Sequence, residues 1–129
     1  LAVLVTTTIK STGGKISLGL FVICVDLGIL FANLLDNAIE ACEKNKTRSE
    51  IMVKTWTEAG YYFLEICNTV ETDILNDNPQ LETNKGDAEL HGVGLRSVRD
   101  IVKKYDGMMS FDQKGNIFHV YVSLEKNDS

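Results

Sequence analysis

Residues 16–35, ISLGLFVICVDLGILFANLL, form the most apolar stretch of the chain and constrain its fold more than any other segment. Asp26 interrupts the stretch in the middle, and Asn33 lies near its end. A membrane-spanning helix needs about 20 residues with few or no charges, so burial inside a folded domain is the better interpretation. From Asp26 onward the apolar residues recur at helical spacing: Leu27, Leu30, Phe31, Leu34, Leu35, Ala38 and Cys42. We therefore expect a buried helix with Asp26 as its N-cap, ending near residues 44–46, after a strand or packed loop over residues 15–25.

One face of this expected helix is polar. Within NLLDNAIEA, residues 33–41, Asn33 and Asn37 are four residues apart, and so are Asp36 and Glu40, which places each pair on one side. A solvated face usually carries Lys, Glu, Gln or Arg, because Asn is a poorer helix former. An amide oxygen is a hard, neutral ligand of the kind that suits Mg²⁺. The pattern alone leaves two interpretations open, a solvated face and a ligand site.

The remaining chain alternates between strand-like and helical segments. Strand composition or alternation marks residues 1–10, 50–58, 61–68, 108–113 and 116–125, and the short AG and KG segments suggest hairpins. Residues 91–107 form a second expected helix, which opens on glycines and closes at Gly107. Residues 69–89 lose all periodicity, and a loop of this length is usually a functional lid or disordered. The order predicts an α+β fold, a two-layer sandwich with helices on one face of a mixed, mostly antiparallel sheet.

Length and charge limit the possible functions. The 129 residues fit a single domain, and their formal net charge is −5. Six acidic residues and one lysine within residues 69–90 account for that charge. Because no basic stripe exists, we expect no nucleic-acid partner. The cysteines, Cys24, Cys42 and Cys67, lack zinc-ligand spacing and are expected to be buried, reduced thiols of a cytoplasmic protein, with a metal site or redox switch as the alternatives.

Two further motifs carry possible ligand chemistry. Gly92 and Gly94 lie in KGDAELHGVGLRSV, residues 85–98, at the start of the second expected helix. Glycine lets backbone N–H groups approach an anion, and a helix N-terminus offers unpaired donors, so this segment suits phosphate. A flexible junction between loop and helix is the alternative. Asn68 ends a strand directly before the long loop, where its side chain can contact a base edge or simply start a turn.

In this order the three motifs resemble those of the GHKL superfamily of ATP-binding domains, and specifically the catalytic domain of bacterial sensor histidine kinases. NLLDNAIEA resembles the N-box, KGDAELHGVGLRSV the second glycine box, and KYDGMMSFDQKGNIFHVYVSL the hairpin that ends the domain. The likeness covers about residues 24–124. It implies a Bergerat-type ATP-binding fold, with ATP and Mg²⁺ as the ligands.

The resemblance also implies roles for single residues. Asn37 would hold the Mg²⁺ that is bound to the ATP phosphates, and Asn33 would line the same pocket. The second glycine box would cradle the phosphates with five residues: His91, Gly92, Val93, Gly94 and Leu95. Lys85 would contact the γ-phosphate from an ATP lid that spans residues 69–90.

Two departures from the family pattern refine the expectation. The first glycine box, an Asp-x-Gly-x-Gly after the strand, is missing, and Asn68 takes the position of the Asp that accepts from the adenine amino group. This loss resembles the accessory-gene-regulator branch of Gram-positive quorum-sensing kinases. ATP-hydrolysing members carry Glu four residues before the Mg²⁺-binding Asn, where this chain has Asn33, which cannot act as a base. The resemblance therefore favours transfer to a protein nucleophile over hydrolysis.

The phosphoacceptor histidine is expected outside this chain. His91 lies inside the glycine box and His119 on a strand, and neither context suits an acceptor. The chain begins with Leu1, so we expect residues 1–129 to be one catalytic domain of a longer, membrane-anchored kinase, on the cytoplasmic side.

The expected partners follow from the same resemblance. They are the dimerisation helices that carry the acceptor histidine and a downstream response regulator. The isolated domain would bind ATP with almost no turnover. Two alternatives stay open: an anti-sigma-factor-type serine kinase of the same fold, and a degenerate domain that acts only as a binding module.

Overall fold

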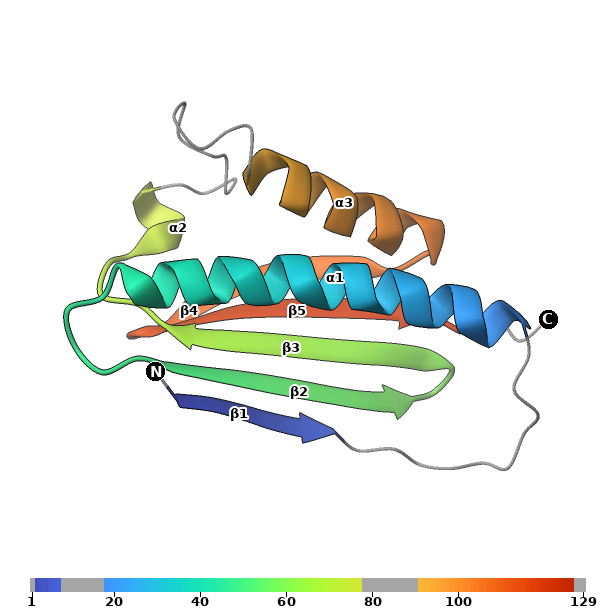
Figure 1. Ribbon diagram of the computed structural model, residues 1–129, viewed down its shortest axis with the longest axis horizontal. Coiled ribbons are helices and arrows are strands. Elements are labelled where there is room, and N and C mark those ends of the chain that lie inside the picture. Colours follow the sequence, from blue (N-terminus) through green and yellow to red (C-terminus); the bar gives the residue numbers. More distant parts are fainter. Residues whose placement is uncertain (1, 8–17, 78–90, 127–129) are drawn as a thin grey trace.

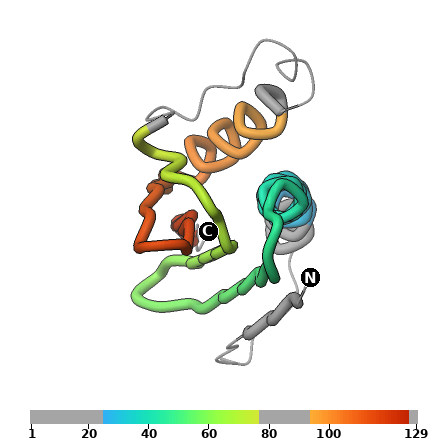
Figure 2. Tube along the Cα trace, turned by 90° about the vertical axis from the view of Figure 1, so that its left-hand side faces the viewer, coloured from blue at the N-terminus to red at the C-terminus, as the bar shows by residue number. Residues whose placement is uncertain are grey.

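Five strands form one sheet, and the helices lie on one side of it (Figure 1 and Figure 2). The computed structural model describes residues 2–7, 18–77 and 91–126, with the side chains of residues 25–76 and 94–126. In chain order the elements are β1 (Ala2–Thr7), α1 (Leu18–Glu43), β2 (Glu50–Glu58), β3 (Tyr61–Thr69), α2 (Ile74–Asp77), α3 (His91–Lys104), β4 (Met108–Lys114) and β5 (Ile117–Glu125). The sheet order is β1-β2-β3-β5-β4, with β1 parallel to β2 and every other pair antiparallel. The predicted α+β fold with a mixed, mostly antiparallel sheet is confirmed.

Helix α1 begins earlier than the sequence predicts. It starts at Leu18, so the expected strand or loop is wrong for residues 18–25, while residues 15–17 lie outside the described part. Asp26 is not an N-cap, because it lies roughly two turns inside the helix. Its carboxylate accepts hydrogen bonds from Lys104 and Tyr105 instead of from the N–H groups of a helix start. The helix ends at Glu43, close to the predicted end.

The core lies between the two helices and the sheet. Leu30, Leu34, Ala38 and Cys42 are buried along one stripe of α1, as their spacing predicts. Helix α1 packs over β2 and β3, and α3 packs over β4 and β5. The core cluster joins the stripe to helix-facing side chains of the sheet and to α3: Ile51, Val53, Leu64, Ile66, Val98, Ile101, Val102, Val120 and Val122. None of the described helices has the length and apolar character that a membrane span requires.

Both predicted hairpins are present with two-residue loops. Ala59 and Gly60 connect β2 to β3 with φ values of 48° and 82°, the pattern of a type I′ turn. Gly115 has a φ of 60° at the first position of the loop between β4 and β5, as a type II′ turn requires. These turns fix the register inside each hairpin, of β2 with β3 and of β4 with β5.

Gly107 follows the second helix, as predicted, but it is not the residue in the left-handed conformation. The left-handed residue is Asp106, with a φ of 46°. Its N–H donates to the Lys103 carbonyl at 3.2 Å, and the Gly107 N–H donates to the Val102 carbonyl at 2.8 Å, which is a Schellman cap. A Cβ on Gly107 would lie 2.0 Å from the backbone oxygen of Ser123 in β5. Glycine is needed here for close packing of the helix end on the sheet.

Burial of the cysteines is confirmed for the two whose side chains the structure describes. Cys42 and Cys67 are buried free thiols, whereas the side chain of Cys24 lies outside the description. Burial raises the pKa of the Cys42 thiol above its usual value, so this thiol stays protonated at neutral pH.

Candidate functional site

The start of α3 lies against the middle of α1. Gly94 faces Asn33 so closely that a Cβ on Gly94 would lie 3.1 Å from the Asn33 side-chain oxygen Oδ1. The Asn33 nitrogen Nδ2 donates to the Ile29 carbonyl oxygen at 2.9 Å, one turn earlier in the same helix. Two residues from separate predicted motifs are therefore brought together, and a larger residue at position 94 would require the Asn33 side chain to shift.

Asp26 of α1 is joined to the C-terminal end of α3. Lys104 Nζ donates to Asp26 Oδ2 at 2.8 Å, and the Tyr105 hydroxyl donates to the same oxygen. The hydrogen bond from Lys104 has the larger effect and that from Tyr105 the smaller, and together they hold the pKa of the Asp26 carboxyl below its usual value. Because Asp26 meets the end of α3 and Asn33 meets its start, α1 and α3 run antiparallel (Figure 1).

Because α1 and α3 run antiparallel, Asn37 lies on the side of Asn33 that is nearer to the N-terminal end of α3. It follows Asn33 by one helical turn, about 6 Å along α1, and is half-buried. Asp26, Asn33 and Asn37 are separated by seven and four residues, so they share the side of α1 that faces α3. The amide of Asn37 and the N-terminal N–H groups of α3 therefore border the same region.

Asn68 enters this layer from the sheet. It is buried at the end of β3, between Ile51 of β2 and Phe118 of β5, which pair with it in register and belong to the core. Alternation along β3 places Asn68 on the face of Leu64 and Ile66, the face that the helices cover. Its Nδ2 donates to the Thr69 carbonyl oxygen at 3.3 Å.

The remaining predicted site residues are placed only in part. Leu95 is half-buried and packs against the core. His91, Gly92 and Val93 form the first turn of α3, but their side chains lie outside the description. Lys85 lies outside the described residues, together with most of the predicted lid.

The described beginning of the lid segment is more ordered than its sequence indicates. The predicted lack of regular structure over residues 69–89 is wrong for Ile74–Asp77, which form the short helix α2. Gln113 Oε1 accepts from the Ile74 N–H at 2.9 Å, and Ile74 and Leu75 pack against the core. Four residues are too few for a visible helical period, so this element depends on tertiary contacts.

Glu71 fixes the same segment to the loop that follows α1. Its Oε1 accepts from the Thr47 hydroxyl at 2.7 Å and from the N–H groups of Lys46 and Thr47 at 3.0 and 2.9 Å. These hydrogen bonds hold the pKa of the Glu71 carboxyl below its usual value, and the bond from the Thr47 hydroxyl has the largest effect.

An open cleft of about 830 Å³ lies beside this connection. It is lined by residues 46–47, 69–73, 113 and 115–116. Residues 69–73 of this lining are the beginning of the predicted ATP lid. Asn33, Asn37, Asn68 and Gly94 are not among the lining residues.

The comparisons with known proteins agree with this architecture. The family model described as the GHKL domain matches residues 22–125. The blue-light activated histidine kinase of Erythrobacter litoralis EL346 is similar with a TM-score of 0.72 and 14% identity, over 96% of this chain and 35% of that one. The catalytic domain of the histidine kinase ThkA is similar with a TM-score of 0.62 and 16% identity, over 79% of this chain and 66% of that one.

A third solved structure, the Acinetobacter baumannii histidine kinase AdeS, is similar with a TM-score of 0.61 and 14% identity, over 98% of this chain and 55% of that one. At these identities the likeness concerns the fold. The chain spans about a third of the length of the Erythrobacter protein. A search of curated proteins found no match to the sequence.

Proposed function

The chain belongs to the GHKL domain family, and from that premise we propose that it is the ATP-binding catalytic domain of a two-component sensor histidine kinase. It binds ATP with Mg²⁺ and transfers the γ-phosphoryl group to a histidine on a dimerisation helix of the same kinase, outside residues 1–129. One observation carries the proposal: the contact of Gly94 with Asn33, which joins the predicted glycine box to the predicted N-box. That contact supports a single ligand region formed by two motifs about sixty residues apart.

The groups that border this region fit a nucleotide triphosphate. The first turn of α3 offers unpaired backbone N–H donors and the positive end of a helix dipole, both of which favour phosphate. Asn37 supplies an amide oxygen, a hard ligand that suits Mg²⁺, and that ion would neutralise charge on the phosphate oxygens. Asn68 offers a side-chain oxygen on the helix-covered face of β3, where it can accept from the adenine amino group.

The environment of Asn33 favours a kinase over a hydrolase. Its nitrogen donates to Ile29 and its oxygen faces Gly94, so this position holds no carboxylate that could take a proton from water. Transfer to a protein nucleophile then depends on positioning and on electrostatic stabilisation of the phosphoryl group.

His119 does not fit the role of acceptor. It lies on the face of the sheet opposite the helices, where its Nδ1 is 3.0 Å from Glu65 Oε1. The location of His119 on this face is consistent with a phosphoacceptor histidine on a dimerisation helix outside residues 1–129.

The wider setting is part of the same proposal. Residues 69–90 act as the ATP lid and Lys85 contacts the γ-phosphate. The domain lies on the cytoplasmic side of a membrane-anchored kinase that signals to a response regulator. Asn68 in the place of the first glycine-box Asp supports a relation to the accessory-gene-regulator quorum-sensing branch.

Calorimetric titration of the 129-residue chain with a non-hydrolysable ATP analogue, with and without Mg²⁺, tests the proposal. We expect binding that depends on Mg²⁺ and that Asn37→Ala weakens at least about tenfold, or about 1.4 kcal/mol, because the variant lacks the ligand oxygen. Alanine is the better helix former, so the variant should remain folded. Asp36→Ala, the exposed neighbour on α1, is the matched control and should bind as the parent does. Binding that ignores Mg²⁺, or equal affinities for Asn37→Ala and the parent, would contradict the proposal.

A further inference from the structure

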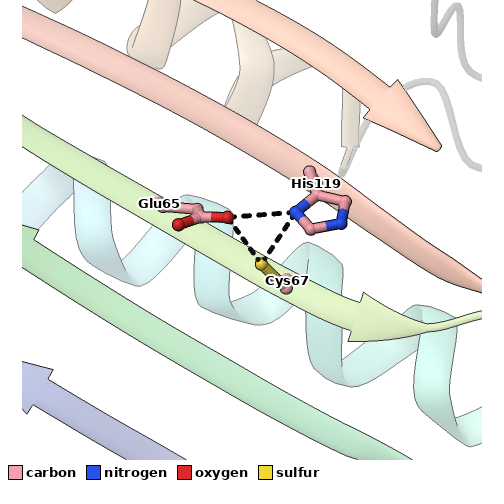
Figure 3. A group of neighbouring side chains, drawn as sticks. All are labelled: Glu65, Cys67 and His119. Carbon is pink, nitrogen blue, oxygen red and sulfur yellow. Dashed lines mark hydrogen bonds and ion pairs between the residues drawn. The ribbon is translucent and has the colours of Figure 1, made fainter. Parts of the chain in front are cut away.

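The face of the sheet that the helices leave uncovered carries a compact group of ligand side chains. Cys67 on β3 pairs with His119 on β5, and Glu65 lies two residues before Cys67 on the same strand. Their neighbours Leu64, Ile66 and Val120 belong to the core, so alternation points these three side chains away from α1 and α3. Figure 3 shows them converging in front of the sheet, with α1 behind it.

The three polar atoms form a nearly equilateral triangle. Cys67 Sγ is 3.2 Å from Glu65 Oε1 and 3.1 Å from His119 Nδ1, and Nδ1 is 3.0 Å from Oε1. Around a tetrahedral zinc ion with ordinary bond lengths, S, N and O ligands lie about 3.3–3.6 Å apart. An outward shift of a few tenths of an ångström would therefore admit the ion.

The surroundings hold the triangle in place. Glu65 and Cys67 are buried, and only 16% of the His119 side chain is exposed. The Tyr121 ring stacks on the His119 ring at 5.7 Å, which restricts the imidazole. Lys54 Nζ lies 3.6 Å from the second carboxylate oxygen of Glu65, leaving Oε1 to face the sulfur and the imidazole nitrogen.

A reactive cysteine is a poor explanation for the group. Burial, and then the hydrogen bond to Glu65 and its charge, raise the pKa of the Cys67 thiol to about 12. Such a thiol is protonated at neutral pH and is a weak nucleophile. A bound divalent cation reverses this effect, since it stabilises the thiolate and the carboxylate together.

We propose that Glu65, Cys67 and His119 bind a zinc ion that bridges β3 and β5, with water in the fourth position. A set of one thiolate, one imidazole and one carboxylate suits zinc, whereas Mg²⁺ and Ca²⁺ take oxygen ligands. Binding releases the thiol proton of Cys67, and the neutral imidazole of His119 keeps its proton on Nε2. The ion ties two adjacent strands at the centre of the sheet.

Cobalt absorption spectroscopy on the 129-residue chain without nucleotide tests this inference independently of ATP binding. Co²⁺ should give the visible bands of a tetrahedral site and a sulfur-to-metal charge-transfer band, at one ion per chain, and Zn²⁺ should displace it. Cys67→Ala should lose the charge-transfer band and bind Zn²⁺ at least about tenfold more weakly in competition with a chelator. Cys42→Ala, which removes the other described buried thiol, should keep both properties.

A second variant keeps the test decisive if Cys67→Ala folds poorly. His119→Gln should retain the sulfur band and weaken Zn²⁺ binding by a similar factor, with unchanged far-ultraviolet circular dichroism. A parent chain without a charge-transfer band would overturn the proposal and leave the triangle as a hydrogen-bonded group. Survival of the band in Cys67→Ala would overturn it as well, by assigning the metal to another cysteine.

Discussion

Gly107 and Gly28 have opposite surroundings, so the same substitution should change stability in opposite directions. A Cβ on Gly107 would lie 2.0 Å from the Ser123 backbone oxygen, and backbone in the sheet cannot move aside easily. Gly107→Ala should therefore lower the free energy of unfolding by about 1–3 kcal/mol or more. A Cβ on Gly28 meets no atom within 4 Å and the residue lies inside α1, so Gly28→Ala should raise that free energy by about 0.5–1 kcal/mol.

Urea unfolding followed by circular dichroism measures both changes. Equal effects of the two substitutions would contradict the close packing of Gly107 on β5.

Gly94 and Asn33 show what can be inferred about single residues from the sequence. The motifs identify each as a ligand residue, and both border the candidate site. Their contact, with 3.1 Å between a Gly94 Cβ and Asn33 Oδ1, depends on how two helices pack and has no local signal. Glu65, Cys67 and His119 escaped prediction for a similar reason, because only the register of β3 with β5 brings Cys67 opposite a histidine fifty-two residues away.

At the scale of elements, local chemistry predicted most of the strands and turns. Alternation identified β5, and a two-residue loop with glycine identified both hairpins. The two errors, the start of α1 and the existence of α2, occur where tertiary contacts decide the structure. Asp26 has the sequence context of an N-cap, yet its carboxylate accepts hydrogen bonds from Lys104 and Tyr105. Helix α2 is stabilised by the hydrogen bond that the Ile74 N–H donates to Gln113.

The junction of α1 with the end of α3 should weaken in acid. Lys104 and then Tyr105 lower the pKa of the Asp26 carboxyl below its usual value. Its contribution to stability is therefore complete above the unfolded-state pKa and is lost as the pH falls through the lowered folded-state pKa. Asp26→Asn should cost about 0.5–1 kcal/mol at neutral pH, since Lys104 is half-exposed.

Urea unfolding at pH values between about 7 and 3 checks this prediction. The difference between parent and Asp26→Asn should shrink below about pH 4, where Asp26 gains its proton first in the unfolded parent and, at lower pH, in the folded parent. Asp100→Asn, at an exposed position of α3, is the control and should change stability by less than about 0.5 kcal/mol at neutral pH. A difference for Asp26→Asn that stays constant down to pH 3 would show that the charge of Asp26 does not matter.

For the molecule as a whole, the sheet separates two chemically different faces. Asn33, Asn37 and Asn68 lie on the helix-covered side, together with the start of α3. The proposed zinc ligands lie on the other side (Figure 3). The two-layer architecture followed from the order of the elements in the sequence. The separation of the faces did not, because it requires knowing which strands are neighbours.

The central claim is that ATP with Mg²⁺ binds between α1 and the start of α3. Amide chemical shifts of the 129-residue chain, measured by nuclear magnetic resonance during titration with a non-hydrolysable ATP analogue and Mg²⁺, test it most directly. The account predicts that the largest shifts occur at Asn33, Asn37, Asn68, Gly92 and Gly94, and that they require Mg²⁺. Largest shifts among residues 46–47 and 69–73 of the cleft, with Asn37 and Gly94 unchanged, would contradict it.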